Sequence, residues 1–272
     1  ISYGLMAALM IIGVAATLKA TEPAGADEVL HEKSAEAPLW TGRGLLDAVV
    51  GPFAAFFKTW GAVGLLMLLF ISLYRLPEFV MGPMATPLYH DLGISKDLVG
   101  AVRGTVGLAA SFLGIAFGGL LVARAGYMRA LIFSGLLQAI GIASYALLSL
   151  YGGDPRLFGA VMMLDNFGVS AAGVALVTYM SSLTSLGYTA TQYALLSSAY
   201  AIVGKFLKGF SGAVVDGLHA HGHTLMESYA YFFVGAGAIG LPALLLCLWL
   251  AAVQGRDRGG RDGPPRNPRL ES

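Results

Sequence analysis

Six charged side chains lie inside long apolar stretches of this sequence, and their type and position could support chemistry. They are Arg75, Glu78, Arg103, Asp165, Lys205 and Lys208. A charge within a bilayer span costs about 3 kcal/mol on insertion scales, so such residues are rare and usually belong to a functional site with a partner. We therefore take all six as candidate site residues.

Three of these charges are expected at one depth, in the outer half of the bilayer. At about 1.5 Å per helical residue, Glu78, Arg103 and Asp165 lie roughly six to nine residues below the outer ends of their spans. Arg75 precedes Glu78 by one turn, a spacing at which the two side chains can pair and simply neutralise each other. Alternatively, a carboxylate near a positive group can load and release a proton as its neighbours change. Glu78 and Asp165 are our candidates for that role.

The set contains more cations than anions. The cations are Arg75, Arg103, Lys205 and Lys208, and the anions are Glu78 and Asp165. Lys205 is expected near the middle of its span, from which a lysine can hardly reach the interface by snorkelling. If these side chains converge on one cavity, the charge balance favours an anionic substrate.

A membrane-embedded helical scaffold must position these charges. The sequence is 56% hydrophobic and 12% charged, whereas soluble domains are about 25% charged. With roughly 20 apolar residues per span, the sequence predicts seven transmembrane helices, near 1–18, 60–86, 97–123, 129–151, 156–183, 190–217 and 228–253. The predicted fold class is all-α, a polytopic membrane protein.

The predicted spans divide the chain into four parts. These are a lone transmembrane helix at 1–18, a cytoplasmic linker at 19–58, a six-helix bundle at 59–254 and a disordered basic tail at 255–272. Within the linker, 43–57 is either an amphipathic helix in the membrane interface or an ordinary connecting helix. Because basic residues favour the cytoplasmic side, the arginine-rich tail predicts a cytoplasmic C-terminus. The apolar helix starts directly at Ile1, which suggests a fragment of a longer protein.

The sequence gives little support for a metal site, an enzyme active site or a nucleic-acid interface. His219, His221 and His223 alternate in a glycine-containing loop, which provides no rigid tetrahedral ligand set, so no metal or other cofactor is expected. No Ser, Cys or His constellation of catalytic spacing lies at one depth, which argues against an enzyme. A net charge of +1 without a basic stripe argues against a nucleic-acid partner.

Five segments of the sequence carry a resemblance to a known family. They are RLPE at 75–78, GTVGLAASFLGIAFGGLL at 104–121, LDNFGVSAAGVALVTYM at 164–180, ATQYALLSS at 190–198 and GK at 204–205. In these segments the chain resembles the second half of the AmpG-type muropeptide permeases of the major facilitator superfamily. Gly119, Arg124, Gly126 and Arg129 fit the superfamily's cytoplasmic hairpin motif, although Ala123 replaces its Asp. Arg103 is displaced from the expected basic position, and Asp165 stands where a Glu is usual. The resemblance covers a little over half of the chain.

The resemblance implies a proton-driven importer of anhydromuropeptides in the bacterial inner membrane. Relatives have two six-helix halves around a central cavity, so the first span would be the sixth helix and the preceding helices would be missing. The implied partners are an anionic glycopeptide, protons, the lipid bilayer and the missing N-terminal half. Expected substrate contacts are Arg75, Arg103, Asn166, Gln192 and Lys205. Expected proton-coupling residues are Glu78 and Asp165.

Two alternative functions are left open by the sequence. Another major facilitator substrate, such as a drug, a sugar or an acyl-CoA, would use the same scaffold. A membrane-embedded scaffold or sensor without transport activity is the second alternative, although charges in the middle of the membrane would serve no purpose there.

Overall fold

The computed structural model describes residues 2–19, 42–184 and 189–249, and every regular element in these ranges is helical. The elements are α1 (Ser2–Lys19), α3 (Gly42–Asp91), α4 (Lys96–Val102), the π-helical turn η1 (Arg103–Gly107), α5 (Leu108–Ala125), α6 (Tyr127–Ala143), α7 (Tyr145–Tyr151), α8 (Pro155–Leu183), α9 (Thr189–Lys208), α10 (Ser211–Ala220) and α11 (Leu225–Ala238). Most of the predicted linker and the whole predicted tail lie outside the described residues.

Five stretches are long and apolar enough to cross a membrane. They are Phe56–Asp91, Lys96–Ala125, Tyr127–Tyr151, Pro155–Leu183 and Leu225–Trp249. They correspond to five of the predicted spans, and the prediction of an all-α polytopic membrane protein is confirmed. Large apolar side chains such as Phe112 and Leu245 are exposed on these helices, as expected where lipid rather than water is the surrounding solvent.

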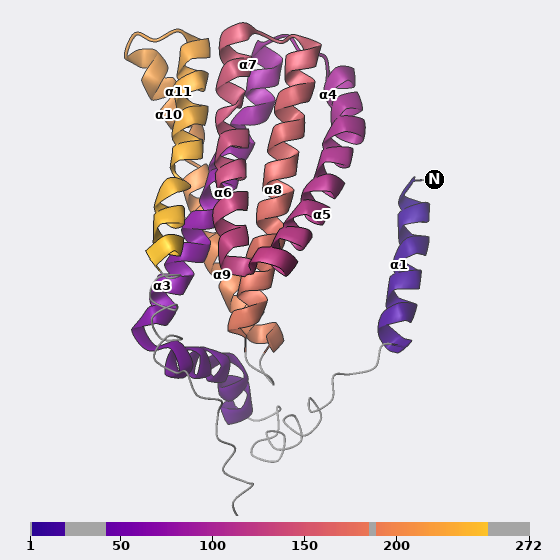
Figure 1. The fold of residues 1–272 in the computed structure, drawn as a ribbon, viewed down its shortest axis with the longest axis vertical. Helices are drawn as coiled ribbons and strands as arrows, with labels where there is room; N and C mark the ends of the chain where they lie inside the picture. Colours follow the sequence, from indigo (N-terminus) through magenta and orange to yellow (C-terminus); the bar gives the residue numbers. More distant parts are fainter. Residues whose placement is uncertain (1, 20–41, 185–188, 250–272) are drawn as a thin grey trace, which may run out of the picture.

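The predicted first span corresponds to α1, whose apolar part is Met6–Lys19. This helix stands apart from the bundle in Figure 1. Its described side chains, among them Met10 and Leu18, are exposed.

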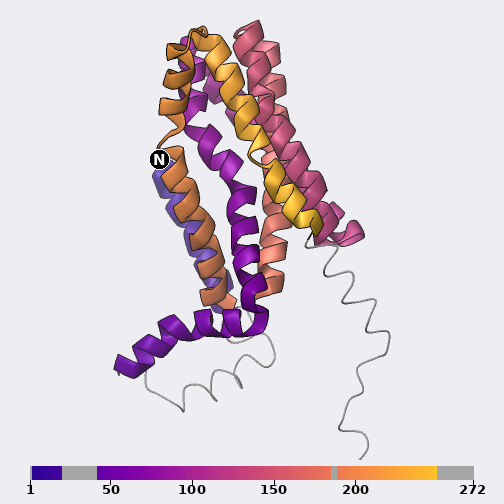
Figure 2. The same cartoon turned by 90° about the vertical axis from the view of Figure 1, so that its left-hand side faces the viewer.

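The predicted span at 190–217 is two helices, and the prediction of one continuous span was wrong. The chain turns at Gly209 and Phe210 between the end of α9 and the start of α10. Glycine is about 1 kcal/mol less favourable than alanine inside a helix, and Ser211 fixes the start of α10 by donating its hydroxyl to the Val80 carbonyl at 2.8 Å. In Figure 2 the two helices follow each other along the bundle.

A kink at Gly61 divides α3 into two limbs. Gly61 has φ 55° and ψ −138°, a conformation that glycine adopts at low cost. The first limb lies across the lower end of the bundle and the second rises through it (Figure 2). Trp60 donates its indole N–H to the Leu183 carbonyl at 3.4 Å, which ties the kink to the end of α8. The side chains that would distinguish an interfacial from an ordinary connecting helix at 43–57 lie mostly outside the described residues, and both interpretations stay predictions.

Small residues let α8 pack closely between α5 and α6. A Cβ atom on Gly168 of α8 would lie 2.8 Å from the Leu137 carbonyl oxygen of α6. On the α6 side, a Cβ atom on Gly141 would lie 2.9 Å from the Asp165 Cα atom. Because backbone approaches backbone at these points, α8 has a fixed depth relative to α6, and this contact sets the position of Asp165.

Candidate functional site

Asp165 lies in the middle of α8 with only 8% of its surface exposed. The Tyr145 hydroxyl of α7 donates to Asp165 Oδ2 at 3.2 Å. Among the residues that the structure describes, Oδ1 has no hydrogen-bond partner. An unpaired buried carboxylate oxygen is costly in free energy and calls for an explanation, such as a bound proton or ligand.

A second tyrosine extends this contact to α3. The Tyr89 hydroxyl lies 3.2 Å from the Tyr145 hydroxyl, and both hydroxyls lie 3.4 Å from Met162 Sδ. The Tyr89 and Tyr145 rings stack at 6.3 Å between centroids. The sequence-based search missed both tyrosines because its search by depth in the membrane considered only charged groups. The depth count that aligned the charges would also have placed Tyr145 in the layer of Asp165.

Arg103 begins the π-helical turn η1, about two turns into the second membrane stretch. Its guanidinium carbon lies 5.8 Å from the centroid of the Tyr89 ring, within the range of a cation–π interaction. π-Helical turns are rare and often occur at functional sites. Arg103 is exposed, so its charged group can reach a ligand as well as the ring.

One cavity joins these groups. It has a volume of about 430 Å³ and is lined by Met81, Gly82, Ala85, Tyr89, Arg103, Gly107, Leu108, Ser111, Tyr145, Met162, Asp165 and Asn166. The Asn166 amide donates to the Met162 carbonyl at 2.8 Å, and the Ser111 hydroxyl lies 3.5 Å from Asn166 Oδ1. This volume lies within the range of about 300–1,000 Å³ that is typical of small-molecule sites. The cavity offers a polar ligand one cation, one carboxylate and several hydroxyl groups.

A second cavity of about 360 Å³ shares Gly82 with the first. Its other lining residues are Glu78, Phe79, Pro83 and Lys208. Glu78 Oε2 lies 2.5 Å from Arg75 Nη1, so the predicted pairing along the helix is confirmed. A Cβ atom on Gly82 would meet no atom within 4 Å. There is therefore open space beside this residue, which lines both cavities.

The four cations are not brought together. Arg103 lines the first cavity and Lys208 the second, while Arg75 lines a third, of about 430 Å³, with residues of α5 and α8. Lys205 is exposed on α9 and lines none of the three cavities found in the described part of the chain. Each of the first two cavities thus holds one cation and one carboxylate, and the excess of cations expected for a single cavity is not found there.

Gln192 lies apart from these cavities, buried on α9 with 1% of its surface exposed. The residues of the predicted hairpin motif also line none of these three cavities. Gly126, at φ 80°, is the single residue between α5 and α6, and an L-residue would be strained there. Arg124 and Arg129 flank it and are exposed, and Gly119 lies in α5.

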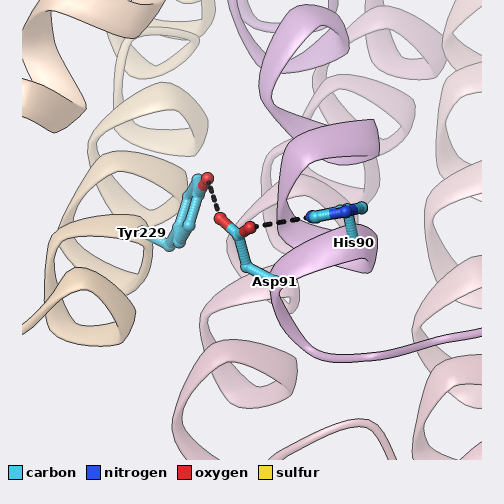
Figure 3. A network of polar contacts seen from close by, with 3 residues as sticks. All are labelled: His90, Asp91 and Tyr229. Atoms are coloured by element: carbon cyan, nitrogen blue, oxygen red, sulfur yellow. Dashed lines mark hydrogen bonds and ion pairs between the residues drawn. The ribbon is translucent and has the colours of Figure 1, made fainter.

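A polar contact joins the C-terminal end of α3 to α11 (Figure 3). The Tyr229 hydroxyl donates to Asp91 Oδ2 at 2.8 Å, and His90 Nδ1 lies 3.2 Å from Asp91 Oδ1. His219, in the last turn of α10, and His221, just after it, bond to backbone carbonyls through Nδ1. Within the described ranges, no group of three His, Cys, Asp or Glu side chains is arranged to hold a metal ion.

Comparison with known proteins gives several relatives but no match to a family model. The chain is 35% identical over 246 residues to the anhydromuropeptide permease of Escherichia coli (strain K12). The matched residues cover 90% of this chain and 46% of that protein. It is 30% identical over 208 residues to the putative transporter AmpG 4 of Rickettsia conorii, covering 75% of this chain and 47% of that protein. The chain spans about half the length of these relatives. The similarity extends well beyond 75–218, the stretch in which the motifs were recognised.

Proposed function

We propose, from the premise that this chain belongs to the AmpG-type permease family, that it forms half of a secondary transporter that imports anhydromuropeptides. The observation that carries the proposal is the polar cavity in which Arg103 and Asp165 face the same space inside an apolar bundle. An ion pair or an ordinary packing role would not need room for a ligand beside an unpaired carboxylate oxygen. The E. coli relative, named an anhydromuropeptide permease, supplies the substrate class.

Each of the first two cavities has a proposed role in this function. In the first, Arg103 and Asn166 bind polar groups of the substrate, and Asp165 exchanges the coupling proton. In the second, Glu78 is the further candidate for proton exchange, with Arg75 as its paired cation. Arg75, Gln192 and Lys205 lie outside the first cavity, so any contact of theirs with substrate involves another part of the path.

The proposed transporter also needs a second half-bundle. Alternating access requires two repeats that rock about a shared site near the middle of the membrane, and this chain provides one bundle, at 59–254. The helix at 1–18 would connect to the preceding half, with the linker at 19–58 between them. We place the protein in the bacterial inner membrane with its C-terminus and the Gly126 hairpin on the cytoplasmic side.

Uptake by vesicles that contain the complete transporter tests this function. A labelled anhydromuropeptide should accumulate when an inward proton gradient is imposed, and a protonophore should abolish the accumulation. Excess unlabelled muropeptide should compete, whereas a drug, a simple sugar or an acyl-CoA should not. Competition by one of those compounds, with no effect of muropeptide, would assign the chain to another transporter function.

A further inference from the structure

Two buried tyrosine hydroxyls form a chain that ends on Asp165. Tyr89 Oη lies 3.2 Å from Tyr145 Oη, which lies 3.2 Å from Asp165 Oδ2. The rings are only 4% and 1% exposed, and the Tyr145 ring is stacked between those of Tyr89 and Phe233. The rings therefore hold both hydroxyls in place beside the carboxylate.

The two hydroxyl groups of this hydrogen-bond chain donate in a preferred direction. Each hydroxyl has one proton to donate, and Met162 Sδ, 3.4 Å from both oxygens, is a weak acceptor. An ionised carboxylate is a much stronger acceptor. Tyr145 therefore donates to Asp165 and Tyr89 donates to Tyr145, so both O–H bonds point toward the negative charge and polarise each other.

The two carboxylate oxygens consequently differ. A proton on Oδ2 would displace the Tyr145 O–H and reverse the chain, whereas a proton on the unpaired Oδ1 leaves the chain intact. We infer that Asp165 is protonated at Oδ1, and that Tyr145, supported by Tyr89, is a positioning residue that holds Oδ2. A hydronium ion that reaches Oδ1 gives up its proton there and leaves as water; the reverse transfer releases the proton. The inference rests on the proposed function, in which Asp165 exchanges the coupling proton.

The hydrogen-bond chain of the two tyrosines can be altered without changing the charges around Asp165. Arg103 from η1 and Glu78 from α3 are the charged groups that act on Asp165, and Tyr145 faces it from α7 and Tyr89 from α3. On the α6 side Asp165 packs against Gly141, which does not titrate. Replacing a tyrosine with phenylalanine removes one hydroxyl and leaves the ring and every charge in place.

Infrared titration of the complete transporter in proteoliposomes tests the inference directly. The carbonyl band of protonated Asp165 is assigned by its loss in Asp165→Asn and followed against pH. In Tyr145→Phe the midpoint should move by about one pH unit to the alkaline side, because the ionised form loses a donor. Tyr89→Phe should give a smaller shift in the same direction. The double variant should match Tyr145→Phe alone, because Tyr89 acts through Tyr145.

Tyr229→Phe is the matched control. Tyr229 is also 4% exposed, and its hydroxyl donates to a different carboxylate, Asp91, so the Asp165 midpoint should not move. An unchanged midpoint in Tyr145→Phe, an equal shift in Tyr229→Phe, or no Asp165 band at any pH would overturn the inference. A shift as expected in a protein that takes up no muropeptide would support the positioning role and refute the proposed substrate instead.

Discussion

Arg103 and Asp165 face one cavity from different elements, yet their surroundings differ greatly. Asp165 is buried and held by Tyr145, whereas Arg103 is exposed and rests over the Tyr89 ring. A fixed buried carboxylate suits reversible protonation, and an exposed cation suits capture of a ligand. The two residues can therefore be tested with different measurements.

Asp165→Asn should abolish proton-driven uptake without preventing membrane insertion. Asparagine has nearly the same size and keeps an acceptor for Tyr145, but it cannot exchange a proton. We expect uptake to fall by roughly 100-fold, the lower end of what a positioned proton-transfer group contributes in enzymes. Insertion should be preserved, since removing a buried charge lowers the cost of insertion. Wild-type uptake by a well-expressed variant would show that Asp165 has only a structural role.

Arg103→Gln should weaken binding of an anionic muropeptide, whereas Lys205→Gln should not. A charge-assisted contact contributes about 1.5–3 kcal/mol, which corresponds to a loss of affinity of roughly one to two orders of magnitude. Lys205 has the same charge but lines none of the three cavities in the described residues. Binding measured by calorimetry should also show a smaller loss for a neutral sugar analogue. Equal losses for both variants would indicate a general effect of positive charge.

Gly82→Leu should narrow the two cavities that Gly82 lines. Its Cβ atom would meet nothing within 4 Å, so the new side chain can occupy open space without disturbing the fold. We expect apparent substrate affinity to fall by roughly tenfold, the factor that about 1.4 kcal/mol of lost binding free energy gives. Gly235→Leu on α11 is the control, because a Cβ atom there also has no neighbour. Unchanged uptake kinetics in Gly82→Leu would show that the space beside Gly82 is not part of the transport path.

At the scale of residues, the sequence was enough to find the charged residues, but not to predict which of them line the same cavity. A charge in an apolar run is visible in the sequence, as Asp165 shows, and the spacing of Arg75 and Glu78 was enough to predict their ion pair. The division of the cations among three cavities depends on the rotation of each helix about its axis. The uncharged Tyr145 was missed because a tyrosine in an apolar span is ordinary until its hydroxyl partner is known.

At the scale of elements, span length was easier to predict than the local form of a helix. Apolar runs of sufficient length gave the five spans, because the bilayer imposes that length. The break at Gly209 has no such signal, since transmembrane helices often contain glycine. The π-helical turn at Arg103 holds one residue more than an α-helical turn would. This extra residue changes which face the residues after the turn occupy relative to those before it.

Gly168→Val should destabilise the contact between α6 and α8. The added Cβ would lie 2.8 Å from the Leu137 carbonyl oxygen, and backbone atoms can yield only if the helices separate. Overpacking of this kind costs about 1–3 kcal/mol, so the thermal unfolding midpoint in detergent should fall. Gly159→Val, in the same helix, is the control, because its Cβ would meet nothing within 4 Å. Equal midpoints for the two variants would show that α8 can shift without loss of stability.

For the whole molecule, the two ends of the bundle have distinct chemical character. The α10–α11 turn is at the upper end in Figure 1, whereas the α5–α6 turn lies toward the lower end. Arg124 and Arg129 flank the lower turn, whereas His219 lies in the last turn of α10 and His221 and His223 lie in the upper turn. Because arginine and lysine concentrate on the cytoplasmic side, the lower end should face the cytoplasm.

Cysteine labelling in intact cells tests this orientation. A cysteine at Gly222, an exposed residue of the α10–α11 turn, should react with a membrane-impermeant maleimide added from outside. A cysteine at Gly260, in the arginine-rich tail, should react only after the membrane is permeabilised. The native Cys247 is buried, with 0% of its surface exposed, so it should contribute little background. The pattern depends on charge distribution alone and not on the substrate, so it tests the topology independently of transport. Labelling of Gly260→Cys but not Gly222→Cys in intact cells would reverse the orientation and place the Arg103–Asp165 cavity in the cytoplasmic half of the membrane.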